Sequence, residues 1–414
     1  MYLQLIILIT VSLVICFRKC FPFRIPVWVI MSIGALISLL YVRFSFTHTL
    51  NSIKWDVIFY LIGIFFIVEA AESSGFLSKV TTSLFSKFKE PKQILFIIVF
   101  VLGSISAIAL NDTTAILGVP IILKLCKNNR QLITPFMLAL AFSITIGSVM
   151  SPIGNPQNLL IASQSHIDPQ FWTFLKNLAI PTIICLTIVY YMISILCKKE
   201  LNSKLVAFQE KTKLCYRSSS VIIISITIFI TLIATKIILS TLQSNQFNLE
   251  FGTISIISAV PVLIFGKKRF KNIKSMDWGT VIFFIAMFIL MQNVWDSGFF
   301  QYLIKNSHIN ISSMPSIFII SITLSQLMSN VPLVTLYLPI LAHTGANTMH
   351  YMALAASSTI AGNIYILGAA STIIIIQNSE KNGIYPFRTI TFSLIGIPLT
   401  ILTAGVYYLF IMYF

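Results

Sequence analysis

Apolar runs long enough to cross a lipid bilayer recur along the whole chain of 414 residues. A spanning helix needs about 20 apolar residues, and about 17 at the least. The runs lie near residues 1–17, 25–42, 55–78, 131–165, 170–197, 219–242, 251–266, 278–300, 351–378 and 389–412. Only 10% of the residues are charged and 57% are hydrophobic, too few charges to cover a soluble surface. The sequence therefore predicts an all-α polytopic membrane protein.

The same composition excludes a soluble enzyme, a nucleic-acid binder and a disordered regulator. The net charge of +16 comes mostly from Lys and Arg in short loops between the apolar runs. These basic loops lie at 18–24, 79–92, 124–130, 198–217, 267–274 and 381–388. Basic loops stay in the cytoplasm during insertion. We therefore expect them on the cytoplasmic side of the inner membrane, with the N-terminus and the C-terminus outside.

The two halves of the chain repeat the same residues in the same order, which indicates an internal duplication. The matching pairs are Trp55 with Trp278, Gly75 with Gly298, Asn111 with Asn330, Pro120 with Pro339, Thr145 with Thr359, and Gly154 with Gly368. We predict a first repeat over 1–197, a cytoplasmic linker over 198–218 and a second repeat over 219–414. With the basic loops in the cytoplasm, the first span runs from outside to inside, whereas its counterpart at 219–242 runs from inside to outside. The repeats are therefore predicted to be inverted, as in many secondary transporters.

Two regions, 93–127 and 314–346, do not divide into two full spans each. The basic loops on either side of the first region share one face, so the chain must enter the membrane and return. A helix from Thr113 to Leu123 would be roughly 17 Å long, which is short of the ~30 Å hydrocarbon core. We therefore predict a re-entrant hairpin in each region, with Asn111-Asp112-Thr113-Thr114 and Ser329-Asn330-Val331-Pro332 at the tips.

Two apolar runs are interrupted in matching places. The run 131–165 contains two Gly and two Pro between Gly147 and Pro156, which no continuous helix accommodates. Asn155-Pro156 is typical of an N-cap followed by the first residue of a new helix. The matching run 351–378 has Gly362 and Gly368 but no proline, so its break depends on glycine. The full prediction is about 11 spans, two re-entrant hairpins and two broken helices.

Helix starts inside a membrane indicate a polar cavity. Backbone groups without helical hydrogen bonds are tolerated at that depth only when they are buried in protein or line a water-filled cavity. Each hairpin tip is predicted to start a helix with Asn or Ser as N-cap, which presents free N–H groups. A mid-membrane carboxylate is expensive, so Asp112 is predicted to take up a proton or bind Na⁺; the alternative is a carboxylate that caps its own helix. Glu69, Glu72 and Asp296 are more typical of interfaces. The candidate substrate- and ion-binding residues are Asn111, Asp112, Thr113, Thr114, Gly154, Asn155, Pro156, Asn158, Ser329, Asn330, Gly362, Asn363 and Gly368.

Four segments resemble the hallmark segments of the ion transporter superfamily, which includes arsenite permeases, sodium–proton antiporters and citrate or dicarboxylate carriers. They are NDTTAILGVPII, SPIGNPQNLLIAS, SNVPLVTLYLPIL and AGNIYILGAAS. The resemblance covers nearly the whole chain. It implies that the hairpin tips and broken helices bind substrate and ions and move like an elevator against a scaffold. Dicarboxylate carriers have a sequence similar to Ser-Asn-Thr at both hairpin tips. Here the tips contain Asn-Asp-Thr and Ser-Asn-Val, which look closer to the arsenite and anion permease branch.

These observations predict a secondary active transporter of a small inorganic solute or an arsenite-like oxyanion, coupled to H⁺ or Na⁺ through Asp112. The alternatives are a Na⁺/H⁺ antiporter and a citrate or dicarboxylate carrier. No zinc-protease, serine-hydrolase or nucleotide-binding motif occurs, so we expect no enzyme, no resident metal and no cofactor besides the coupling ion. The expected partners are the bilayer and the solute, with no nucleic acid. A homodimer and a partner ATPase stay open.

Overall fold

The computed structural model describes residues 2–17, 25–41, 46–76, 88, 90–165, 170–203, 216–241, 249–299, 302 and 310–413. These residues are helical throughout and contain no β-strand. Among them, six helices are long and apolar enough to cross a membrane, and further apolar helices are shorter. The basic loop at 18–24, most of the one at 79–92 and residues 204–215 of the linker lie outside the described residues.

The first half contains spans, a helical hairpin and a broken helix. In chain order its elements are α1 (Tyr2–Phe17), α2 (Val27–Tyr41), α3 (Phe46–Ser52), α4 (Trp55–Ser73), α6 (Pro91–Phe96), the π-helix η2 (Ile97–Leu102), α7 (Gly103–Ala109), α8 (Asn111–Leu125), η3 (Arg130–Leu132), α9 (Ile133–Gly147), η4 (Ser148–Met150), α10 (Pro156–Gln164), α11 (Gln170–Leu196) and α12 (Lys198–Leu201). Proline is the first residue of α6 and of α10, where its missing N–H costs no helical hydrogen bond.

The second half follows the same order. Its elements are α13 (Tyr216–Thr241), α14 (Phe251–Phe265), α15 (Arg269–Ser275), α16 (Trp278–Asp296), α18 (Met314–Met328), α19 (Asn330–His343), α20 (Thr348–Ile360), the 3-10 helices η5 (Ala361–Asn363) and η6 (Ile366–Gly368), α21 (Ala370–Lys381) and α22 (Thr389–Tyr413). The matched pair α4 and α16 ends the same way, because Gly75 and Gly298 follow with positive φ angles of 77° and 76°.

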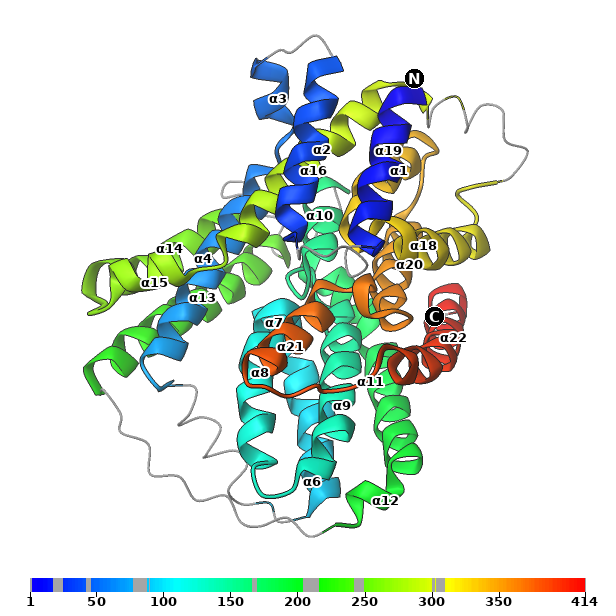
Figure 1. Ribbon diagram of the computed structural model, residues 1–414. Coiled ribbons are helices and arrows are strands. Elements are labelled where there is room, and N and C mark those ends of the chain that lie inside the picture. The colour runs from blue at the N-terminus through cyan, green and yellow to red at the C-terminus, as the bar shows by residue number, and fades with distance from the viewer. Residues whose placement is uncertain are drawn as a thin grey trace.

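The halves exchange packing partners (Figure 1). Helix α14 of the second half lies along α4 of the first, and α2 of the first half lies along α16 of the second. Gly63 permits the first approach, because a Cβ there would come within 2.6 Å of the main-chain carbon of Ser255. A polar contact supports the second, since Asn293 Nδ2 donates to Ser38 Oγ at 2.9 Å. The same exchange recurs between α8 and α21 and between α10 and α19.

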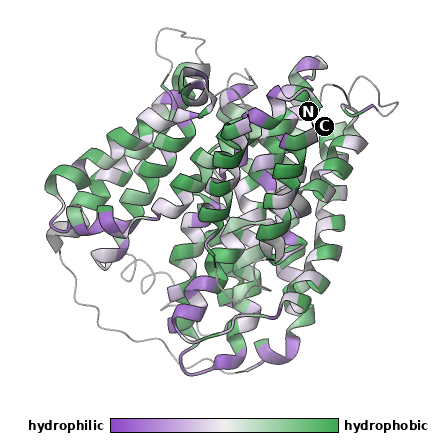
Figure 2. Cartoon of the chain, turned by 45° about the horizontal axis from the view of Figure 1, so that its top comes forward, coloured by the Kyte–Doolittle hydropathy of each residue, from purple (hydrophilic) through white to green (hydrophobic). Residues whose placement is uncertain are grey.

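The predicted apolar runs coincide with helices to within a few residues at their ends. Apolar residues cover the outer faces of the helices, while polar residues gather toward their ends (Figure 2). The short helices α3 and α15 and the π-helix η2 were not predicted, because none of them has a length that hydropathy alone can distinguish. The breaks after α9 and α20 lie where the proline and glycine pattern predicts them.

Candidate functional site

The tip of the first hairpin is a tight turn at Leu110, which has a positive φ of 65° and precedes α8. The prediction that Asn111 caps this helix is therefore wrong by one residue, since Asn111 is already its first residue. Its main-chain N–H donates to Gly154 O at 2.9 Å, and its side-chain oxygen accepts from Asp112 N at 2.9 Å. This hydrogen bond joins the tip to the break between α9 and α10. It cannot be predicted from neighbouring residues, because its two partners are far apart in the sequence.

The next residues of α8 differ in how their polar atoms are satisfied. Thr114 Oγ1 donates to Leu110 O at 2.8 Å, which closes the turn. Asp112 is 3% exposed, and its carboxylate has no hydrogen bond or ion pair within the described residues. The alternative in which Asp112 caps its own helix is therefore not what the structure shows. Thr113 is fully buried, and its Oγ1 has no hydrogen-bond partner in the described part of the chain.

The tip of the second hairpin repeats this geometry. Ser329 has a positive φ of 71° and precedes α19, as its N-cap, but its side chain makes no capping hydrogen bond. Asn330 is 5% exposed, and its Oδ1 has no hydrogen-bond partner among the described residues. Both tips therefore place an Asn at the first residue of a helix directly after a strained turn.

Amide side chains fill the first break. Asn155 is the N-cap of α10, as predicted, and its Oδ1 accepts from Asn158 N at 2.8 Å. Its Nδ2 donates to Ser148 Oγ at 2.9 Å. The Nδ2 of Asn158 donates to Val149 O and Ser151 O, both at 3.1 Å. Asn155 and Asn158 thus stabilise the unwound backbone itself, while Pro156 and Gln157 line the cavity described below.

The second break has the same backbone course, but its own amide does not bond to it; instead Gln326 Nε2 of α18 donates to Ala361 O at 2.9 Å. A Cβ at Gly362 would come within 3.2 Å of Asn330 Nδ2 and 2.8 Å of Ala369 Cβ, so tip and break are in contact. Asn363 is fully buried, and neither its Oδ1 nor its Nδ2 has a hydrogen-bond partner in the described residues. Gly368 lies at the cavity wall.

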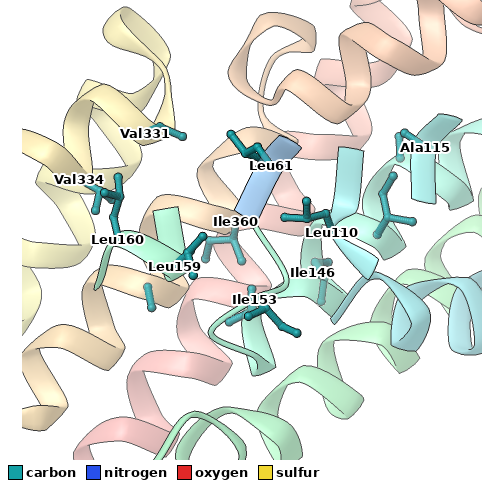
Figure 3. Close-up of a cluster of buried hydrophobic side chains, with 14 of the residues drawn as sticks. Leu61, Leu110, Ala115, Ile146, Ile153, Leu159, Leu160, Val331, Val334 and Ile360 are labelled. Atoms are coloured by element: carbon teal, nitrogen blue, oxygen red, sulfur yellow. The ribbon is translucent and has the colours of Figure 1, made fainter. Parts of the chain in front are cut away.

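A cavity of about 1370 Å³ reaches both hairpin tips. Its wall includes the first residues of α8, α10, α19 and α21, which are Asn111, Pro156, Asn330 and Ala370. Four helix starts at one cavity present N–H groups and partial positive charge. Buried apolar side chains hold these starts in place: Val334 of α19 lies beside Leu160 of α10 (Figure 3).

The cavity also brings together carboxylates that are far apart in the sequence. Glu69 and Glu72 on α4 line it together with Asp112. Lys274 and Lys381 line it too, so its wall carries both signs of charge. Asp296 is not part of this wall; its Oδ2 lies 3.3 Å from Nε2 of His48. Of the three carboxylates that the sequence analysis named outside the tips, the structure therefore brings Glu69 and Glu72 to the candidate site.

The sequence matches a family described as "Citrate transporter" (CitMHS) over residues 6–355, which is most of the chain. The chain belongs to this citrate transporter family. Its relatives are membrane transporters. An uncharacterized transporter of Mycobacterium tuberculosis (strain H37Rv) is 23% identical over 354 residues, which cover 80% of each chain. The silicon efflux transporter LSI3 of Oryza sativa is 23% identical and covers 73% of this chain and 75% of its own.

A solved structure supports the fold. The crystal structure of the YdaH transporter of Alcanivorax borkumensis superposes with a TM-score of 0.53 and 12% identity. It covers 89% of this chain and 87% of the YdaH chain. The putative transporter arsB of Dictyostelium discoideum is 27% identical over 151 residues, 36% of this chain and 26% of its own. The predicted membership of the ion transporter superfamily is thereby confirmed.

Three polar residues near the transporter's site were not among the candidates. Ser371 and Thr372, in the first turn of α21, are fully buried, and their hydroxyls have no hydrogen-bond partner within the described residues. Thr359 of α20 lies within 3.3 Å of Asn155 Nδ2 across the halves. The predicted duplication could have indicated all three, because they stand at or beside matched positions of the two breaks.

Proposed function

We propose that this member of the citrate transporter family is a secondary active transporter that carries a small inorganic solute or oxyanion, arsenite-like, across the cytoplasmic membrane. Coupling is to H⁺ or Na⁺. The observation that carries the proposal is the cavity into which four helix starts and both hairpin tips open. Half-helix starts in matching places of two repeats are the usual substrate site of such transporters.

The groups at the tips favour a small solute. They are amides and main-chain N–H groups, and neither tip contains Lys or Arg. A large polyanion is usually held by bidentate Arg or by Lys. An oxyanion or hydroxylated acid needs only a few donors and acceptors, which the helix starts provide. Asp112 adds a carboxylate to the wall, which suits proton uptake more than the binding of a second anion.

The two halves are proposed to be inverted repeats, with both hairpins re-entrant. The support is the duplicated element order, the strained turn at each tip and the exchanged packing of the halves. On this topology the cavity opens to the cytoplasm, because Lys274 and Lys381 lie beside basic loops. We propose that the hairpins and broken helices move as one unit against α4, α14, α2 and α16.

A citrate or dicarboxylate carrier is the second candidate. The family description and the two lysines of the cavity wall favour it. A Na⁺/H⁺ antiporter would use Asp112 in the same cavity. The relatives named putative transporter arsB and silicon efflux transporter LSI3 favour the inorganic solute.

Uptake into proteoliposomes tests the substrate. The purified full chain is tested with arsenite, silicic acid, citrate and succinate under imposed Na⁺ or pH gradients. We expect gradient-driven flux of arsenite or silicic acid, and an Asn330→Ala variant should lose it. An Asn310→Ala variant, on an exposed turn, is the matched control and should keep it. Flux of citrate or succinate alone would replace the proposal with the second candidate.

Cysteine labelling tests the topology. In a cysteine-free background, Lys127→Cys should react with a membrane-impermeant thiol reagent only from the cytoplasm, and Ala346→Cys only from outside. Both positions follow the second arm of a hairpin, α8 and α19 respectively. Labelling of both from the same face would contradict inversion.

A further inference from the structure

The short helices α3 and α15 occupy matching places in the two halves, each just before a span that begins with tryptophan. Trp55 Nε1 donates to Leu50 O at 3.2 Å, and Trp278 Nε1 donates to Ile273 O at 2.7 Å. Each carbonyl lies five residues before its tryptophan. The same hydrogen bond therefore holds each short helix against the span that follows it.

The charges of the two short helices differ. Helix α3, with the sequence FTHTLNS, contains no Lys or Arg, whereas α15, with the sequence RFKNIKS, contains three and directly follows Lys267 and Lys268. The tryptophan hydrogen bond forms in α3 without these charges, so the local fold does not require them. Basic residues next to a span orient it in the membrane, but that rule does not concern the side chains beside them.

Three cations at the beginning of α15 are fixed at the surface without a carboxylate. Lys267, Lys268 and Arg269 are exposed. Lys268 Nζ donates to Ser73 O at 3.2 Å, and Arg269 Nη1 donates to Ile264 O at 3.0 Å. Both acceptors are neutral carbonyls at the ends of α4 and α14, and none of the three cations forms an ion pair within the described residues. The hydrogen bonds therefore position the cations and leave their charge uncompensated.

Exposed apolar side chains lie directly beside these cations. Phe270 is 75% exposed, and the Arg269 guanidinium lies over its ring, 5.2 Å from the centroid. Helix α15 follows the end of α14 and packs alongside α4 (Figure 1). At that end of α14, Ile264 and Phe265 are 55% and 69% exposed. Cations beside an exposed aromatic, at the end of an apolar span, are typical of a surface that lies at the lipid headgroups.

This surface is separate from the transport cavity. Its residues are not among those that line the cavity. The two remaining cations of α15 are placed differently, since Lys271 interacts electrostatically with Glu69 of α4, and Lys274 lines the cavity. The beginning of α15 therefore has a positive charge that neither the local fold nor the cavity uses.

We propose that an anionic phospholipid binds here, with its phosphate at the three cations and its acyl chains along Ile264 and Phe265. We call the binding residues the α15 basic surface, which consists of Lys267, Lys268, Arg269 and Phe270. A zwitterionic headgroup brings its own positive charge to these cations, so charge complementarity favours an anionic lipid. On the proposed topology the lipid is in the cytoplasmic leaflet. This inference goes beyond the proposed function, because it does not depend on the solute.

Lipid binding to the purified full chain tests the proposal. Native mass spectrometry and thermal unfolding in a neutral detergent are measured with dioleoyl phosphatidylglycerol, dioleoyl phosphatidylcholine or inorganic phosphate. We expect phosphatidylglycerol to bind more tightly and to raise the unfolding temperature more. The double variant Lys267→Gln/Lys268→Gln should weaken phosphatidylglycerol binding roughly 25-fold, about fivefold per charge, and leave phosphatidylcholine binding unchanged. It should fold, because the new amide at position 268 can still donate to Ser73 O.

A matched variant separates this surface from positive charge in general. Lys127→Gln/Arg130→Gln removes the same charge from exposed positions of another basic loop, where no large hydrophobic side chain is exposed in the described residues. It should keep the affinity of the wild type for phosphatidylglycerol. Phe270→Ser should weaken both lipids by the same factor, because Phe270 contacts the part that they share.

Three results would overturn the proposal: equal affinity of the wild type for the two lipids, equal losses in the two double variants, or stabilisation by inorganic phosphate in place of phosphatidylglycerol. If the Lys267→Gln/Lys268→Gln protein does not fold, Lys267→Gln alone decides. Lys267 has no hydrogen bond in the described part of the chain, and its loss should cost about fivefold in phosphatidylglycerol affinity. An unchanged affinity in this single variant would equally contradict the proposal.

Discussion

The break after α9 and the break after α20 occupy matching places in the two halves, yet they are stabilised in different ways. In the first, Asn155 and Asn158 hold the unwound backbone through their own amides. In the second, Asn363 lies in an equally buried position with no partner in the described residues. The two breaks thus share a backbone course while their side chains differ. The difference separates a break that its own amide side chains stabilise from one whose buried polar atoms have no such partners within the described residues.

The largest expected effect concerns the stability of the purified protein. Asn158→Ala should lower the free energy of unfolding by about 2–5 kcal/mol, because it leaves buried carbonyl groups such as Val149 O unpaired. Asn363→Ala should change it by less than about 1 kcal/mol, because no hydrogen bond is lost. Thermal unfolding in choline chloride measures both. Equal destabilisation by the two variants would remove the contrast between the breaks.

The second expected effect concerns coupling. Asp112→Asn keeps the size of the side chain and removes its ionisation, and no capping hydrogen bond is lost, so folding should be intact. Substrate exchange should persist, whereas pH-driven accumulation in proteoliposomes should disappear. An Asn variant with full coupling and unaltered pH dependence would redirect the search to Glu69 and Glu72, which line the same cavity.

The smallest expected effect comes from exchanging the proline between the breaks. Pro156→Ala should reduce uptake more than expression, although the Asn155 cap remains and stability should fall by no more than about 1 kcal/mol. Ala370→Pro should be tolerated, because this residue starts α21 after an extended Ala369 with φ −128° and ψ 136°. Uptake and unfolding temperature measure both. A misfolded Ala370→Pro protein would show that the two backbones differ after all.

The fold could be predicted from the sequence where its signals are local. Bilayer-length apolar runs define the spans, and Asn155-Pro156 contains both the cap and the fixed φ angle that start α10. The turn at Leu110 could not be predicted in this way. A leucine with positive φ is stable only because distant groups hold it, among them Gly154, which accepts the hydrogen bond from the next residue.

The candidate site could be predicted only to the level of its segments. The tips and breaks were identified, and the cavity brings both tips together. Which polar atoms remain available was not predictable, because it depends on distant neighbours: Asn158 finds carbonyl partners, whereas Thr372 at the matching position has none within the described residues. Thr359 shows the reason: its hydroxyl contacts three side chains of the other half, which lie 201 to 204 residues away in the sequence.

The exchange of partners between the halves has a consequence for how the chain is made. Helix α4 enters the membrane early in synthesis, but α14, against which it packs, is translated much later. Until then Asp56 lacks the main-chain N–H of Gly252, which donates to its Oδ1 at 2.6 Å, and Gly63 lacks Ser255. The nascent first half must therefore remain in the bilayer without these packing contacts until α14 has been synthesised. Contacts between segments far apart in the sequence make folding slow. The stability of each half therefore depends on the presence of the other.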